Sequence, residues 1–146
     1  MLTYGPASAE DVDVLFPMVE ELIDRYEDFS VMNREKILAW SRKSIGDHLP
    51  DYSRIYLNGQ LAGFYSLWTE ADKTEIDNLF LLPPFRGQGI GTAVLKKCIA
   101  ETAQNLFLYV FRENSGAVRL YQRLGFRTVQ EVGTTRYIME YRKEGC

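Results

Sequence analysis

A glycine-rich segment at residues 86–92 constrains what this chain can fold into more than any other part of it. The segment reads Arg86-Gly87-Gln88-Gly89-Ile90-Gly91-Thr92 and lies between a predicted strand and a predicted helix. Glycine allows dihedral angles that other residues avoid, and the first N–H groups of a helix have no partner within it. The segment therefore predicts a strand-to-helix turn whose backbone donors, helped by the Arg86 charge, can approach an anion such as a pyrophosphate.

Two other glycine-rich motifs do not match the spacing of this turn. A dinucleotide-binding fold requires Gly-x-Gly-x-x-Gly after the first strand of a βαβ unit, but here the third glycine comes one position early and the turn follows a strand meander. The Walker pattern does not match either, because no Lys-Ser or Lys-Thr pair follows. Short glycine motifs also occur in turns that bind nothing, so the turn alone leaves that alternative open.

The rest of the chain predicts a mixed sheet covered by helices. Helices are predicted at about 9–28 with Ser8 and Asp11 as a capping box, from Asn33 to near Gly46, at about 89–103, and from Asn114 to Gly125. Strands are predicted at 2–5, 52–57, 61–68, 74–82, 106–111, 126–132 and 135–141. The order β-α-α-β-β-β-α-β-α-β-β contains no repeat and no linker, and it predicts one domain over residues 1–146.

The composition argues against several classes of protein. The net charge is −3 and no run of Lys or Arg is present, which argues against a nucleic-acid partner. The N-terminus carries no basic region followed by an apolar run, and no apolar stretch approaches the roughly 20 residues of a membrane span. We therefore expect a cytoplasmic protein without a membrane partner. Cys98 and Cys146 form no disulfide framework, and His48 is the single histidine, so no metal site is expected.

Two motifs together carry a family resemblance. Residues 86–91 match the pattern Gln/Arg-x-x-Gly-x-Gly/Ala of GNAT N-acetyltransferases, and residues 114–126 resemble the family segment Asn-x-x-Ala-x-x-Leu-Tyr-x-x-x-Gly-Phe. The predicted strand at 106–111 separates them, as in the family. The chain therefore resembles the GNAT superfamily strongly over residues 74–127 and weakly over residues 1–50.

The resemblance implies a fold and a co-substrate. The fold is of the α/β (α+β) class, with a mixed, mostly antiparallel sheet of about seven strands that splays between strands 74–82 and 106–111, flanked by four helices. Acetyl-CoA is the implied co-substrate, with no metal. The residues implied to bind it are Leu79, Leu81, Arg86, Gly87, Gln88, Gly89, Ile90, Gly91, Thr92 and Asn114. The Leu81 N–H is the implied donor to the thioester oxygen, and Leu79 to Leu81 are implied to pair with pantetheine.

Acid and base candidates lie in the same region. Tyr121 occupies the motif position implied to protonate the CoA thiolate, although its helical spacing alone indicates core packing. Glu75 and Asp77 are two residues apart on a strand and share a face, so each is a candidate base, directly or through water. Two close carboxylates also raise one pKa. The alternative for Glu75 is a solvated strand end, and the alternative for Asn114 is a helix cap.

The acceptor is expected to be a small-molecule amine, an amino acid or a polyamine-like compound. The acidic and aromatic residues expected near it lie at 20–29 and at Trp40, Tyr65 and Trp68, although an ordinary amphipathic helix explains the first group equally well. Arg136 is an alternative partner for a substrate carboxylate. Arg119 and Arg123 are candidates for the 3′-phosphate of CoA, or simply solvated.

Three functions remain open on the sequence. The first is an active N-acetyltransferase that works by direct transfer in a ternary complex. The second is a GNAT-like module that binds acyl-CoA as a sensor without turnover, and the third is a nucleotide-binding regulator. The resemblance leaves the acyl-chain length and the oligomeric state undecided, with a homodimer among the options.

Overall fold

The structure is a computed structural model that describes residues 1–143. The contacts divide the chain into two compact units, the first comprising Met1–Ser66 and Asn78–Pro84 and the second Leu67–Asp77 and Phe85–Cys146. The single domain expected for residues 1–146 stays a prediction. Cys146 lies outside the described residues.

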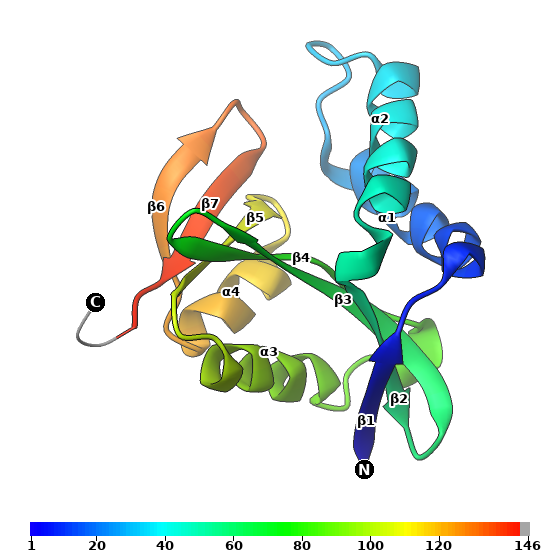
Figure 1. The fold of residues 1–146 in the computed structure, drawn as a ribbon. Coiled ribbons are helices and arrows are strands. Elements are labelled where there is room, and N and C mark those ends of the chain that lie inside the picture. Colours follow the sequence, from blue (N-terminus) through cyan, green and yellow to red (C-terminus); the bar gives the residue numbers. More distant parts are fainter. Residues whose placement is uncertain (144–146) are drawn as a thin grey trace. The chain divides into compact units, whose positions relative to one another are not determined.

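Seven strands and four α-helices follow one another in the predicted order (Figure 1) among residues 1–143. The strands are β1 (Leu2–Pro6), β2 (Tyr52–Leu57), β3 (Gln60–Glu70), β4 (Lys73–Leu81), β5 (Asn105–Phe111), β6 (Arg127–Val132) and β7 (Arg136–Tyr141). The helices are α1 (Val12–Tyr26), α2 (Arg34–Asp47), α3 (Ile90–Glu101) and α4 (Ser115–Arg123). No helix in this part of the chain combines the length and the hydrophobicity needed to cross a membrane.

The strands form one mixed sheet in the order β1-β2-β3-β4-β5-β7-β6. The pairs β1–β2, β2–β3, β5–β7 and β6–β7 are antiparallel, and β4–β5 is parallel. This arrangement confirms the expected α/β (α+β) fold with a mostly antiparallel seven-stranded sheet and four helices.

The element ends differ from the prediction by one to three residues. The first helix begins as a short 3₁₀ turn at Ala9–Asp11, and the Ser8 N–H donates to Asp11 Oδ2 over 2.9 Å, as one half of a capping box requires. That helix ends at Tyr26, because Glu27 adopts an extended backbone with φ −78° and ψ 151°. The second helix is capped as expected, since Asn33 Oδ1 accepts from the Lys36 N–H over 3.0 Å.

The first unit buries an apolar core between its two helices and its strands. The residues of this core are Leu15, Val19, Ile23, Ile37, Leu38, Ile45, Tyr52 and Phe64. On α1 the core residues recur every four positions, and on α2 Leu38 and Ile45 are seven positions apart, which places one face of each helix toward the core. The sequence pattern therefore accounts for this half of the molecule directly.

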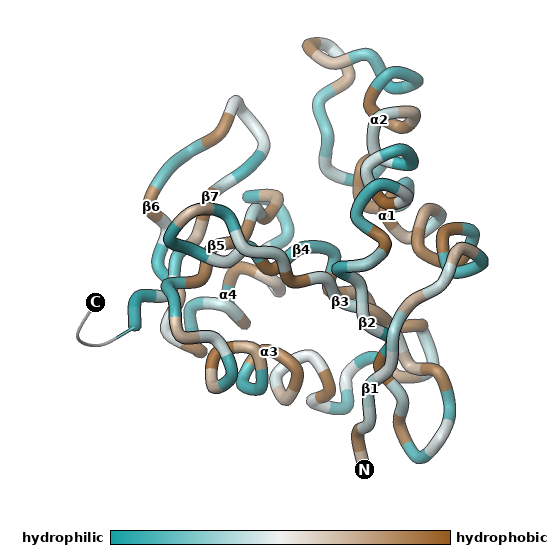
Figure 2. Tube along the Cα trace, in the orientation of Figure 1, coloured by the Kyte–Doolittle hydropathy of each residue, from teal (hydrophilic) through white to brown (hydrophobic). Residues whose placement is uncertain are grey.

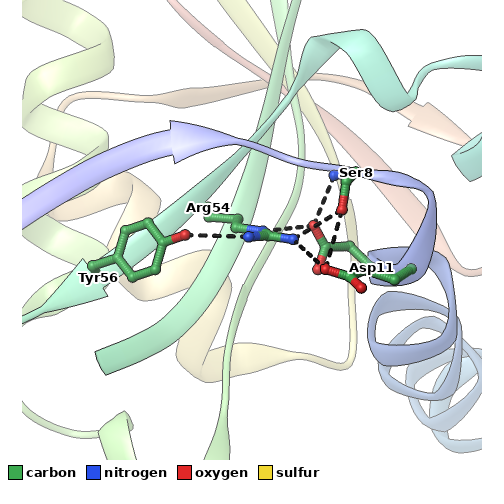
Figure 3. A network of polar contacts seen from close by, with 5 residues as sticks. Ser8, Asp11, Arg54 and Tyr56 are labelled. Carbon is green, nitrogen blue, oxygen red and sulfur yellow. Dashed lines mark hydrogen bonds and ion pairs between the residues drawn. The ribbon is translucent and has the colours of Figure 1, made fainter. Parts of the chain in front are cut away.

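A polar network joins the start of the first helical segment to β2 within the same unit (Figure 3). Arg54 Nε donates to Asp11 Oδ2 over 2.7 Å and its Nη2 to Ser8 Oγ over 2.9 Å, while Nη1 contacts the Tyr56 hydroxyl over 3.3 Å. The Asp11 carboxylate is buried, so this charge-assisted pairing compensates for its desolvation.

Strand β4 departs from regular geometry in the first unit. Asn78 has φ +47°, and its Nδ2 donates to the Tyr52 hydroxyl over 2.5 Å. Asparagine tolerates the left-handed region better than most residues, and the buried Tyr52 hydroxyl gives its side chain a partner there. Nearby, Gly63 of β3 lies so close to Phe80 of β4 that a methyl group would overlap the Phe80 carbonyl oxygen.

The second unit is built around β5. Leu106, Leu108 and Val110 are buried on one face of the sheet, and Phe107, which is also buried, alternates with them onto the opposite face together with Tyr109 and Phe111. α3 and α4 lie on the same side of β5 and β7 (Figure 1), and α3 presents Val94, Leu95 and Cys98 as its buried face. Hydrophobic and hydrophilic residues alternate around this helix (Figure 2).

The close approach at Gly63 generates a prediction for stability. Gly63→Ala is expected to lower the free energy of unfolding by about 2 kcal/mol, because the added methyl group must push apart two strand backbones. Urea denaturation followed by circular dichroism measures this change.

The matched control is Gly46→Ala in α2, where an added methyl group meets nothing within 4 Å. This substitution is expected to leave stability unchanged or to raise it by up to about 1 kcal/mol, since alanine favours helix over glycine. A Gly63→Ala protein as stable as the wild type would contradict the packing described for β3 and β4.

Candidate active site

The glycine-rich turn is open at the start of α3. Gly87 and Gly89 have φ +74° and +81°, which explains why glycine is required at both positions. A Cβ built at Gly87, Gly89 or Gly91 would meet nothing within 4 Å, and residues 86–89 are exposed. The turn therefore leaves room for a ligand beside the first N–H groups of a 12-residue helix.

The parallel pairing of β4 with β5 is short. It joins Lys73 to Asn105, Thr74 to Leu106 and Glu75 to Phe107. β4 continues to Leu81 and β5 to Phe111, so both strands extend past the last pair. The pairing ends at Glu75, although Ile76 and Asp77 continue β4 within the same unit, and the expected splay beyond this point stays a prediction.

Two carboxylates lie at the point where this pairing ends. Glu75 is only 8% exposed, and Asp77 follows it on the same face. Burial raises the pKa of Glu75 to about 8, with further contributions from Asp77 and Glu70. The alternative interpretation of Glu75 as a solvated strand end is therefore wrong.

Tyr121 combines packing contacts with proximity to Asp77. Its ring lies 5.8 Å from that of the buried Phe126, and its carbonyl oxygen accepts from the Phe126 N–H over 3.0 Å. Burial, with a smaller contribution from the charge of Asp77, raises the pKa of Tyr121 to about 12. The phenol thus keeps its proton at neutral pH. Tyr121 therefore packs against Phe126 and is also influenced by the charge of Asp77.

Asn114 caps α4, with its Oδ1 accepting from the Ala117 N–H over 3.4 Å. This contact is the capping role that the sequence offered as one alternative. Arg119 and Arg123 are both exposed on the same helix. Arg119, with Arg112 and Tyr137, lines a hollow of about 460 Å³ that neither Glu75 nor Tyr121 lines.

The residues expected near the acceptor divide between the two units. In the first unit, Arg34 pairs with Asp24 over 2.7 Å and with Glu20 over 3.1 Å, so part of the acidic segment 20–29 is neutralised on its own surface. Of the aromatic residues, Tyr65 is buried and Trp40 is 66% exposed in that unit. Trp68 belongs to the second unit.

The structure adds one residue that the sequence reasoning missed. Tyr109 is 48% exposed, and its pKa is raised by burial, by Glu75 and by Glu70. Glu70 of β3 and Glu75 of β4 thus both oppose the ionisation of its hydroxyl. The sequence signal was the alternation in β5, which puts Tyr109 on the same face as Asn105 and Phe107.

Leu79 and Leu81 belong to the first unit and are partly buried. Their role toward a co-substrate therefore stays a prediction. Among residues 1–143, no three His, Cys, Asp or Glu side chains are placed so that they could hold a metal ion.

A prediction follows from the buried carboxylate of Glu75. In the unfolded chain this group ionises near pH 4.5, and in the folded protein near pH 8. Between these values the folded state holds a proton that the unfolded state has lost, so the free energy of unfolding falls as the pH rises. Glu75→Gln removes this component, and the variant is expected to gain stability relative to the wild type by a few kcal/mol between about pH 5 and pH 8.5.

Urea denaturation at about pH 5 and about pH 8.5 measures the difference in the free energy of unfolding between Glu75→Gln and the wild type. Glu113→Gln is the control, because Glu113 is an exposed glutamate of the same unit. Parallel pH profiles of the wild type and Glu75→Gln would show that the carboxylate is not buried as described.

Comparison with known proteins places these features in a family. The model of the acetyltransferase (GNAT) family matches residues 16–126. A spermine/spermidine N(1)-acetyltransferase of Bacillus subtilis (strain 168) is 34% identical over 86 residues, which cover 50% of this chain and 57% of that enzyme. The chain thus spans little more than half the length of this relative.

Two further similarities extend over more of the chain. A ribosomal protein bS18-alanine N-acetyltransferase of Escherichia coli (strain K12) is 28% identical over 113 residues, covering 73% of this chain and 76% of that enzyme. The crystal structure of a paia N-acetyltransferase from Thermoplasma acidophilum, in complex with coenzyme A, superposes with a TM-score of 0.71. It shares 22% sequence identity and covers 98% of this chain and 99% of its own, so this similarity shows the fold alone.

Proposed function

Because the chain belongs to the acetyltransferase (GNAT) family, we propose that it transfers an acetyl group from acetyl-CoA to a primary amine of a small molecule. The transfer is direct, within a ternary complex. The observation that supports this most is the placement of Asp77, whose charge acts on both the buried Glu75 and Tyr121 within one unit. A possible base and a possible acid thus meet where the pairing of β4 with β5 ends.

The co-substrate fits the turn before α3. When bound, acetyl-CoA supplies the activated acetyl group as a thioester. The N–H groups of Gly87, Gly89 and Gly91 and of their neighbours Gln88, Ile90 and Thr92 hold its pyrophosphate, and Arg86 adds charge. The open space at the three glycines supports this assignment, since a side chain at any of them would occupy it. Leu79 pairs with pantetheine, the Leu81 N–H donates to the thioester oxygen, and Asn114 lies near pantetheine while capping α4.

Glu75 and Asp77 are the two bases that we assign to the removal of the acceptor's proton. An alkyl ammonium has a pKa near 10.4, so a base must take its proton before the nitrogen can attack. Glu75, with a pKa of about 8, is matched to this transfer near neutral pH better than an ordinary glutamate. Asp77, two residues further along β4, is the second candidate base and accepts the proton directly or through water.

Tyr121 supplies the second proton transfer. Its hydroxyl holds a proton at neutral pH and donates it to the sulfur as the C–S bond breaks. The tyrosinate then regains a proton from the amine nitrogen through solvent, so the products are an amide and the free thiol of CoA. The buried ring contact with Phe126 keeps the hydroxyl in place.

The test combines binding with turnover. We expect isothermal titration to detect CoA and acetyl-CoA but not AMP or NAD, and a panel of primary amines to release CoA thiol above background. Gly89→Ala is expected to weaken CoA binding about tenfold, because a side chain at φ +81° forces the turn to rearrange.

Gly46→Ala is the control for this substitution and should bind CoA like the wild type. Binding without thiol release for any amine would favour an acyl-CoA sensor over an enzyme. Binding of AMP or NAD as tight as that of CoA would point to a nucleotide-binding regulator instead.

For the acid, Tyr121→Phe is expected to lower kcat about 100-fold while the affinity for acetyl-CoA stays the same, because only the proton donor is removed. Stopped assays of thiol release give kcat, and titration gives the affinity. Unchanged turnover in this variant would exclude Tyr121 as the acid.

A further inference from the structure

The hollow of about 460 Å³ that Arg119 lines belongs wholly to the second unit. Four residues of α4, two of β6, Tyr137 of β7 and Arg112 after β5 form its lining. Sites for small molecules typically have volumes of about 300–1,000 Å³. The hollow is therefore large enough to hold a small ligand.

The hollow lies on the other face of the sheet from the carboxylates of β4. Tyr137 is paired with Val110 of β5, and paired residues on neighbouring strands point to the same face. Glu75 is paired with Phe107, which alternation along β5 places on the face opposite to Val110. A ligand in the hollow is thus separated by the sheet from the groups assigned to proton transfer.

Helix α4 also uses a different side for the hollow than for the proposed acid. The α4 residues of the lining are Ser115 and the residues three, four and seven positions after it, so they form one side of the helix. Tyr121 is not one of them, and its ring packs against Phe126 with 5.8 Å between the ring centres. The hollow therefore does not belong to the site already described.

Arg112 lines the hollow in a position that three contacts fix. Its Nη2 pairs with the Glu131 carboxylate, and its Nη1 donates to the Thr134 carbonyl oxygen over 3.4 Å. Its guanidinium also lies 5.1 Å from the centre of the Tyr137 ring. A guanidinium that is held on an aromatic ring and paired on one edge loses little freedom when a ligand binds to its other N–H groups.

The lining carries one more positive charge than it neutralises. Arg112 and Arg119 are its two cations, and Glu131, which pairs with Arg112, is the one acid among the described residues that line it. Arg119 is exposed and takes no part in that pair. The hydroxyl groups of Ser115 and Thr128 add donors without charge. The hollow therefore favours an anion over a cation.

We propose that this hollow binds a small anion through its phosphate or carboxylate group, with Arg119 and Arg112 as the charged contacts. A guanidinium presents two parallel N–H donors, which match the oxygen atoms of either group. The inference goes beyond the proposed function, because it requires neither acetyl-CoA nor an amine. Arg119 then serves this anion and not the 3′-phosphate of CoA.

The experiment titrates inorganic phosphate into the ¹⁵N-labelled protein at constant ionic strength and records ¹H–¹⁵N correlation spectra. We expect the amide signals of residues 112–122 and 128–137 to shift, with half-saturation on the order of 1 mM for two charge-assisted contacts. Arg119→Gln is expected to weaken this binding at least about fivefold, because one of the two cations is removed. A parallel titration with succinate tests the carboxylate in the same way.

Arg123→Gln is the matched control, because it removes an exposed arginine of the same helix that does not line the hollow. This variant should bind phosphate like the wild type. CoA is titrated separately into Arg119→Gln and is expected to bind as it does to the wild type. Arg119 is exposed, so its substitution should leave the circular dichroism spectrum unchanged.

The outcomes separate this site from the proposed co-substrate site. Shifts that are absent with both anions, or confined to residues 86–92, would overturn the anion site, as would equal binding in Arg119→Gln and the wild type. A loss of CoA affinity in Arg119→Gln would assign this arginine to the co-substrate and also overturn the inference. Failure of the wild type to bind CoA or to release thiol counts against the proposed function alone.

Discussion

The short parallel pairing between β4 and β5 is the constraint on which the candidate site depends. Three residue pairs join the strands, and the pairing ends at Glu75 and Phe107. A continued ladder would place both strand edges in hydrogen bonds and leave no unpaired backbone after Glu75. The irregular geometry of Asn78, three residues further along β4, is a local feature that a regular ladder does not accommodate. The proposed proton-transfer groups Glu75 and Asp77 therefore lie where the sheet stops being regular.

Burial at this point gives ordinary side chains unusual properties. Glu75 is among the few charged residues that are buried, and unlike Asp11 it has no arginine to compensate for its desolvation. The same environment keeps Tyr121 protonated, since burial and the charge of Asp77 both oppose ionisation. One carboxylate with a raised pKa, one neighbouring carboxylate and one neutral phenol are the groups that the proposed proton transfers use.

Much of the fold and part of the site could be predicted from the sequence because the signals are local. Ser8 and Asn33 begin helices, and Gly87 and Gly89 occupy positive φ angles where glycine has no steric penalty. Strand alternation put Glu75 and Asp77 on one face. By contrast, Tyr109 was missed, because the charges that act on its hydroxyl come from three other strands that are distant in sequence.

The sequence by itself determined the order of the elements and the glycine turn before α3, and it put Glu75 and Asp77 on one face of a strand. These follow from the dihedral preferences and the periodicity of short segments, which do not depend on distant contacts. Only the tertiary structure decided that Glu75 is buried rather than solvated, that the pairing of β4 and β5 stops beside it, and that Arg112 and Arg119 line one hollow. Burial and electrostatic coupling depend on which strands become neighbours in the sheet, and no local pattern encodes that environment.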